Sequence, residues 1–234
     1  MLMLEVEKLS ASYGASRILF DIDLKIGEAE TVCILGRNGV GKTTSLKAIN
    51  GICKPRSGSV KFGGKEIAGL PPYRISRLGI AYVPQGRHIF PNLTTRENLI
   101  IAFRKGDNPE IQWTTQKIYQ LFPVLKDREN LKGKSLSGGE QQMLTIARGL
   151  MQNPRLLLMD EICEGLAPLI VKELQEVVQE LKKSGVSILL AEQNINFAVA
   201  VSSRYYILEK GQIVFNGNTS EITQDTIHKY LATQ

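Results

Sequence analysis

The sequence predicts an α/β protein with a mainly parallel core sheet, an antiparallel β region near the N-terminus and an inserted helical lobe. Three observations predict this fold: alternating apolar and polar stretches come first, near-continuous apolar runs next to helical patterns recur later, and helical patterns dominate the middle. The chain has 234 residues, 43% hydrophobic and 22% charged, which is ordinary globular composition. We expect one domain over residues 1–234.

The antiparallel region is predicted from three alternating stretches in the first third of the chain. In residues 18–26, apolar side chains occupy every second position, and the polar residues Asp21, Asp23 and Lys25 stand between those from Phe20 onward. Residues 3–9 and 59–67 follow a similar pattern. A period of two is typical of a strand that is buried on one face only, so these stretches predict a half-exposed sheet.

The parallel core is predicted from three apolar runs, residues 31–35, 155–159 and 186–191. Strands covered on both faces have such continuous runs. One helix is well marked: it begins near Pro168 and ends before Gly185, with an apolar stripe spaced three and four residues apart.

The middle and the end of the chain predict the remaining elements of the fold. Residues 86–148 carry mostly helical patterns and are expected to form the inserted lobe, so residues 1–85 and 149–234 would form the core with its antiparallel β region. Lys210-Gly211 between two apolar stretches predicts a β-hairpin. A short helix is expected to close the chain.

Composition excludes several classes of protein. No apolar run exceeds about five residues, where a bilayer span needs roughly 18, and the first residues lack the basic and apolar pattern of a secretory segment, so we expect a cytoplasmic protein. Three cysteines without metal-ligand spacing predict reduced, mostly buried thiols. The net charge of +6 is spread without a basic block, and we expect no nucleic-acid partner.

A phosphate-binding motif follows the first apolar run. The segment Gly36-Arg37-Asn38-Gly39-Val40-Gly41-Lys42-Thr43 fits G-x-x-x-x-G-K-[ST] and lies between a predicted strand and a helical pattern. In this context glycines let backbone amides surround phosphate oxygens, Lys42 reaches the outer phosphates, and Thr43 can bind Mg²⁺.

A second acidic element suits the same chemistry. The run 155–159 ends in Asp160 and Glu161, which places carboxylates at the carboxyl edge of the sheet, where nucleotide phosphates bind. Asp160 is predicted to bind the metal. Glu161 would face another direction and polarise the water that attacks the γ-phosphate.

A third element carries a family resemblance. Leu136-Ser137-Gly138-Gly139-Glu140, with Gln141-Gln142 and residues 146–150 after it, resembles the signature of ATP-binding-cassette (ABC) ATPases. The order of Tyr13, the phosphate loop, Gln85, the signature, the acidic strand and Glu192-Gln193 also fits that family, over essentially the whole chain.

This resemblance implies ATP and Mg²⁺ as cofactors and a phosphate-loop ABC ATPase fold. Tyr13 would stack on adenine, residues Gly36 to Thr44 would bind phosphates and Mg²⁺, and Gln85 would touch Mg²⁺ or the attacking water. Two cassettes of this family meet head to tail, so Ser137, Gly138 and Gly139 would cover the nucleotide held by the other cassette. The catalytic residues implied are Lys42, Gln85, Glu161 and Gln193.

Several positions depart from the family pattern. Ile162-Cys163 replaces a common Pro-Ser/Thr, and Ala167 stands where many relatives have Asp. Gln193 stands where a switch histidine usually contacts the γ-phosphate. Glutamine can donate a hydrogen bond but does not titrate, so we expect reduced but real hydrolysis.

The same departures narrow the resemblance. Residues 82–94, 164–168 and 191–194 look like the smaller ATPase subunit of branched-chain amino-acid importers, whose relatives also import urea or short amides. This implies permease subunits in the membrane, an extracytoplasmic solute-binding protein, and a position on the inner face of the membrane. It also implies a second cassette, for which the subfamily points to a paralogue. Residues 87–99 would line the groove for a permease helix. A soluble ABC ATPase without a transporter and a non-enzymatic regulatory subunit are the alternatives.

Overall fold

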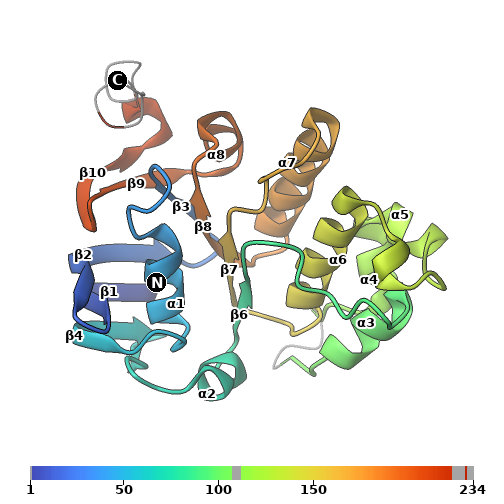
Figure 1. Ribbon diagram of the computed structural model, residues 1–234, viewed down its shortest axis with the longest axis horizontal. Helices are drawn as coiled ribbons and strands as arrows, with labels where there is room; N and C mark the ends of the chain where they lie inside the picture. Colours follow the sequence, from blue (N-terminus) through green and yellow to red (C-terminus); the bar gives the residue numbers. More distant parts are fainter. Residues whose placement is uncertain (1, 107–111, 223–229, 231–234) are drawn as a thin grey trace.

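The computed structural model describes residues 2–106, 112–222 and 230, and Figure 1 shows its arrangement. Two sheets lie at one end of the molecule, and a group of helices forms a lobe at the other end. The α/β class predicted from the sequence is confirmed. In the described ranges no helix is long and apolar enough to cross a membrane.

The smaller sheet is antiparallel, with the order β2-β1-β4-β5. Its strands are β1 (Leu2–Tyr13), β2 (Ser16–Gly27), β4 (Pro55–Phe62) and β5 (Lys65–Glu66). The single strand predicted over 59–67 is wrong, because Gly63 and Gly64 have φ of 54° and 76° and turn the chain between β4 and β5.

The larger sheet has the order β10-β9-β3-β8-β7-β6, and all its strands are parallel except the edge strand β10. Its strands are β3 (Thr31–Leu35), β6 (Ile80–Val83), β7 (Leu156–Asp160), β8 (Ser187–Glu192), β9 (Arg204–Glu209) and β10 (Gln212–Asn218). The three predicted core strands and the Lys210-Gly211 hairpin are confirmed, within one residue at the strand ends.

Helices cover the larger sheet and build the lobe (Figure 1). They are α1 (Lys42–Ile49), α2 (Pro72–Arg77), α3 (Thr95–Ala102), α4 (Thr115–Leu121), α5 (Pro123–Asp127), α6 (Gly138–Leu150), α7 (Pro168–Lys183) and α8 (Ile195–Val201), with 3-10 turns at Gly133–Ser135 and Thr219–Glu221. The helix predicted from Pro168 is confirmed as α7. The expected lobe boundary after residue 148 falls inside α6, and the predicted closing helix lies almost wholly outside the described residues.

Two apolar cores explain why the strands of the larger sheet have continuous apolar sequences. Alternate residues of these strands face opposite ways, so Val32 and Ile34 pack with α1 and the antiparallel sheet. Cys33 and Leu35 pack into the other core, with helices α6, α7 and α8. Burial on both faces fixes the sheet rigidly and holds the loops at its carboxyl edge in place.

Candidate functional site

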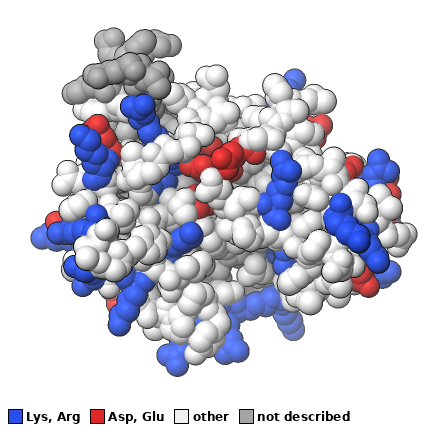
Figure 2. All heavy atoms as spheres, viewed as in Figure 1, with Lys and Arg blue, Asp and Glu red and all other residues white. Residues whose placement is uncertain are grey.

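Apart from the signature residues 137–139, the predicted site residues gather near the carboxyl edge of the larger sheet, beyond the ends of β3, β7 and β8. Residues 36–41 join β3 to α1, Asp160 ends β7, and Gln193 follows β8. In Figure 2 acidic side chains gather near the centre of the face shown, whereas Lys and Arg side chains are spread around it.

Two glycines of the phosphate loop are required by close packing. A Cβ on Gly36 would lie 2.6 Å from the carbonyl oxygen of Leu208, and a Cβ on Gly41 would lie 2.8 Å from Leu19 Cδ2. Gly41 also has a φ of +113°, which only glycine adopts without strain. Within the described chain no hydrogen bond occupies the amides of residues 37–41, which are free to bind an anion.

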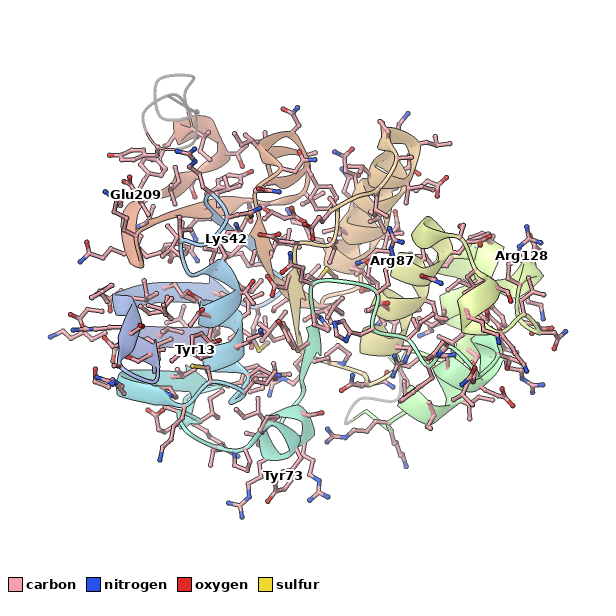
Figure 3. All side chains as sticks on the ribbon, in the orientation of Figure 1. Tyr13, Lys42, Tyr73, Arg87, Arg128 and Glu209 are labelled. Carbon is pink, nitrogen blue, oxygen red and sulfur yellow. The ribbon has the colours of Figure 1, made fainter. Side chains whose placement is uncertain are left out.

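Lys42, labelled in Figure 3, is buried at the start of α1. Its Nζ donates to the carbonyl oxygens of Gly36 at 2.9 Å and Arg37 at 3.0 Å, and lies 2.9 Å from Glu161 Oε1. The ammonium is thus held beside the free amides of residues 37–41, where it adds a positive charge to the site.

Glu161 and Gln85 form a second group beside Lys42. Gln85 Nε2 donates to Glu161 Oε2 at 3.1 Å and to Glu164 Oε2 at 2.8 Å. Glu161 has a φ of 46°, which turns its side chain away from the direction of Asp160. The predicted divergence of the two carboxylates is therefore present, and both oxygens of Glu161 have a donor.

Asp160 is fully buried and accepts two hydroxyl groups. Thr43 Oγ1 donates to Oδ1 at 3.0 Å and Tyr82 Oη donates to Oδ2 at 2.9 Å. Burial raises the pKa of Asp160, and the two hydrogen bonds oppose that rise. Thr43, Asp160 and Gln85 all border a cavity of about 570 Å³. Hydroxyl, carboxylate and amide oxygens suit Mg²⁺, so this donor set fits the metal.

A smaller cavity of about 200 Å³ joins Tyr13 to the phosphate loop. Tyr13 ends β1 and is half exposed, and the cavity is also bordered by Gly39, Lys42 and Thr44. An exposed aromatic ring beside free amides is a suitable stacking surface for a nucleotide base.

The last residue of β8 is a buried acid, Glu192, and the residue after it is an exposed amide, Gln193. Burial raises the pKa of Glu192 to about 7, and the nearby Glu161 carboxylate adds to the rise. Gln193 is exposed beyond the end of β8, which neighbours β3, and it makes no hydrogen bond in the described structure. It is therefore free to reach a ligand.

The signature residues are not brought to the loop of the same chain. Ser137 caps α6, where its hydroxyl accepts the amide of Glu140 and its own amide donates to the Glu140 carboxylate. Figure 1 places the start of α6 in the helical lobe, across the larger sheet from α1. Gly138 and Gly139 thus lie at the positive end of a 13-residue helix, away from the phosphate loop of their own chain.

Four residues of this region were given no role at the site from the sequence, although Glu192 was named in the family order and Arg87 lies in the segment 87–99. They are Tyr82, which binds Asp160, Glu164, which binds Gln85, Glu192, and Arg87, which lies against Gly138. The short run Ile80–Val83 between Gly79 and Pro84 was the available signal for β6 and hence for Tyr82.

Comparisons with known proteins agree with this geometry. The sequence profile of the ABC transporter family matches residues 19–164. The chain is 42% identical over 214 residues to the high-affinity branched-chain amino acid transport ATP-binding protein BraG of Pseudomonas aeruginosa, covering 92% of each chain. It is 38% identical to the probable branched-chain amino acid transport ATP-binding protein LivF of Archaeoglobus fulgidus, over 95% of this chain and 94% of LivF. It is 32% identical to the lipopolysaccharide export system ATP-binding protein LptB of Haemophilus influenzae, over 96% of this chain and 94% of LptB.

Solved structures show the same fold. A nucleotide-free ATP-binding cassette from an ABC transporter superimposes with a TM-score of 0.83 at 26% identity, over 99% of this chain and 95% of the other. A dimeric cassette in a post-hydrolysis state bound to ADP and phosphate superimposes with a TM-score of 0.80 at 25% identity, over 93% of this chain and 99% of the other. Together with the loop, the acidic strand and the signature, these matches establish that the chain belongs to the ABC transporter family, as an ATP-hydrolysing cassette.

Proposed function

We propose that this cassette powers an importer of branched-chain or related hydrophobic amino acids. The observation that carries the proposal is its identity of 42% and 38% to two branched-chain amino acid transport ATP-binding proteins over more than nine-tenths of the chain. The export ATPase LptB is less similar, at 32%. A urea or short-amide importer is the nearest alternative, since that solute would be selected by other subunits.

The proposed catalytic unit is a pair of cassettes that share two molecules of ATP. The free amides of the loop and Lys42 bind the phosphates, and Tyr13 stacks on adenine. Thr43, Asp160 and Gln85 hold Mg²⁺, and Glu161 activates water, with Gln193 hydrogen-bonded to the γ-phosphate. Ser137, Gly138 and Gly139 cover the nucleotide of the partner cassette, which we propose to be a paralogue. The outward-facing start of α6 and the dimeric relative support this arrangement.

The membrane partner is proposed to dock on a groove of the helical lobe. This groove has a volume of about 440 Å³ and is bordered by His88, Ile101, Arg104 and Arg148. Phe90, Ile100, Ile101 and Phe103 are exposed large apolar side chains on the same lobe. Of the segment 87–99 expected to line the groove, His88 does so. A groove with a mixed polar and apolar lining, on a lobe with exposed apolar side chains, suits an amphipathic helix of a permease. Such a helix would hold the cassette on the cytoplasmic face of the membrane, with a solute-binding protein on the other side.

Transport and assembly test the proposal together. We expect the chain, its permeases and its second cassette to copurify, and proteoliposomes to accumulate labelled leucine when ATP is on the cassette side. Ile101→Glu should abolish copurification, whereas Leu2→Glu, at an exposed apolar residue of β1, should not. Solute efflux, or uptake of urea without leucine, would reject the assigned direction or solute.

The paired-cassette site has its own test. Glu161→Gln should keep ATP binding and trap an ATP-dependent pair, because the loop, Lys42 and the metal ligands remain. Ser137→Arg should leave ATP binding by the single cassette nearly intact and prevent pairing. Rapid turnover by Glu161→Gln would show that Glu161 is not the base.

A further inference from the structure

Arg87 lies directly against the start of the signature helix. A Cβ built on Gly138 would come within 2.5 Å of Arg87 Nη1 and 2.6 Å of its Cζ, so the guanidinium occupies the space that a side chain at position 138 would need. Gly139 is limited in the same way by Ile170, whose side-chain carbons would be 3.1–3.2 Å from its Cβ. The two glycines therefore sit between a cation and an apolar wall.

The charge of Arg87 is not neutralised within the described parts of the chain. No carboxylate there lies within 4.0 Å of its guanidinium. Its one hydrogen bond, from Nη2 to the carbonyl oxygen of Gly165, is long at 3.5 Å. Arg87 is exposed, and Figure 3 shows it between α6 and α7. A weakly held guanidinium can turn toward an anion at little cost.

Most of the surrounding groups favour an anion at this point. The first amides of α6 belong to Gly138 and Gly139, and the helix dipole is positive there. The Glu140 carboxylate, which could compete, is already bound by the Ser137 amide and by Arg128. An arriving phosphate would therefore meet Arg87 and the glycine amides together.

We propose that Arg87 binds the γ-phosphate of the ATP held by the partner cassette, beside Gly138 and Gly139. The inference rests on the proposed pairing of two cassettes and adds a residue to it. Gln193 cannot carry a positive charge near the γ-phosphate, whereas a guanidinium stays charged at every physiological pH. Arg87 would supply that charge from the opposite side of the shared nucleotide.

The test measures ATP-driven association in the Glu161→Gln background, with a second copy or with the other cassette of the same transporter. Arg87→Ala, Arg87→Gln and Arg87→Lys are compared by light scattering against ATP concentration. We expect Ala and Gln to need at least tenfold more ATP and Lys to stay within about threefold, because Lys keeps the charge. ATP binding by the single cassette and thermal unfolding should not change. Arg74→Ala, at an exposed arginine of α2, is the matched control.

Each outcome separates the role of Arg87 from the pairing itself. Arg87→Gln associating like the parent would overturn the proposal, since charge would then be unimportant. Equal losses in Gln and Lys would also overturn it, in favour of simple packing against Gly138. If the Glu161→Gln parent does not associate with ATP, or if Ser137→Arg associates normally, the paired site fails and the role of Arg87 fails with it.

Discussion

Lys42 Nζ lies 2.9 Å from Glu161 Oε1, and both side chains are buried, with 3% and 6% of their surface exposed. This ion pair joins the residue proposed to hold phosphate to the residue proposed to activate water. The three N–H donors of this ammonium are already used by Gly36 O, Arg37 O and Glu161, so a bound phosphate displaces one of these acceptors. We predict that Glu161 is displaced, which would free its carboxylate for its proposed role as a base.

This competition predicts opposite effects of two substitutions on ATP affinity. Lys42→Ala should weaken ATP binding by the single cassette roughly 10- to 100-fold, the value of one charge-assisted hydrogen-bond donor. Glu161→Gln should leave the affinity equal or tighter, because the competing charge is gone. Calorimetry with Lys61→Ala, at a partly exposed lysine of β4, as control measures both. Equal weakening in the two variants would mean that the ion pair supports the loop rather than competes with phosphate.

Tyr82 is predicted to stabilise the fold through Asp160. Tyr82→Phe removes the donor to Oδ2 and leaves a fully buried carboxylate with Thr43 alone. We expect a loss of about 1–2 kcal/mol in the free energy of unfolding. Tyr73→Phe, at a ring that is 57% exposed, should change it by less than about 0.5 kcal/mol. Urea denaturation compares the two, and equal stabilities would show that water replaces the Tyr82 hydroxyl.

Much of this site could be predicted because its residues lie in local motifs. The loop, Asp160 and Glu161 follow buried strands, so a strand pattern and a short motif were enough to place them. Burial on both faces made those strands easy to recognise. The strand β6 is only four residues long, and the turn Gly63-Gly64 lies inside one alternating stretch, so neither gave a distinct pattern.

The missed residues act across long separations in sequence. Tyr82 meets Asp160 over 78 positions, and Gln85 meets Glu164 over 79. Such pairs depend on the parallel register of β6 and β7, which no periodicity reveals. The position of Arg87 over Gly138 likewise depends on how the helical lobe packs. The motif residues could therefore be predicted from the sequence, whereas the residues that hold their side chains in place could not.

The raised pKa of Glu192 predicts that the stability of the folded protein depends on pH. Its pKa is raised to about 7 in the folded protein from an ordinary value of 4.5, so between these values the native state holds a proton that the unfolded chain has lost. Stability must then fall as pH rises from about 4.5 to about 7, by up to about 3 kcal/mol. The contribution is lost above pH 7 and is fully present below 4.5.

Glu192→Gln isolates this effect, because an amide is neutral at every pH. We expect the variant to match the parent at pH 5 and to exceed its unfolding free energy by about 2–3 kcal/mol at pH 8. Glu180→Gln, at an exposed acid of α7, should show no such trend. Urea unfolding at a series of pH values measures the difference. A gap that does not widen with pH would mean that Glu192 is ionised in the native protein.

The contacts of Gly211 predict that the β9–β10 hairpin supports the position of the phosphate loop. It donates its amide to the carbonyl oxygen of Val40 at 2.9 Å, and its own carbonyl accepts the amide of Phe20 at 2.8 Å. A Cβ at this position would lie 1.9 Å from the carbonyl oxygen of Ile18, and φ is +78°. The chain cannot admit a methyl group here without moving β2, the hairpin or the loop.

Gly211→Ala should therefore cost at least about 3 kcal/mol of stability and weaken ATP binding, because Val40 belongs to the phosphate loop. Gly14→Ala is the matched control: its φ is +57°, also left-handed, but nothing lies within 4 Å of a Cβ there, so only the backbone cost of about 1 kcal/mol applies. Thermal unfolding and nucleotide titration compare the two variants. If Gly211→Ala loses no more than Gly14→Ala, the contact with Ile18 is relieved by a small shift, and the hairpin does not fix the loop.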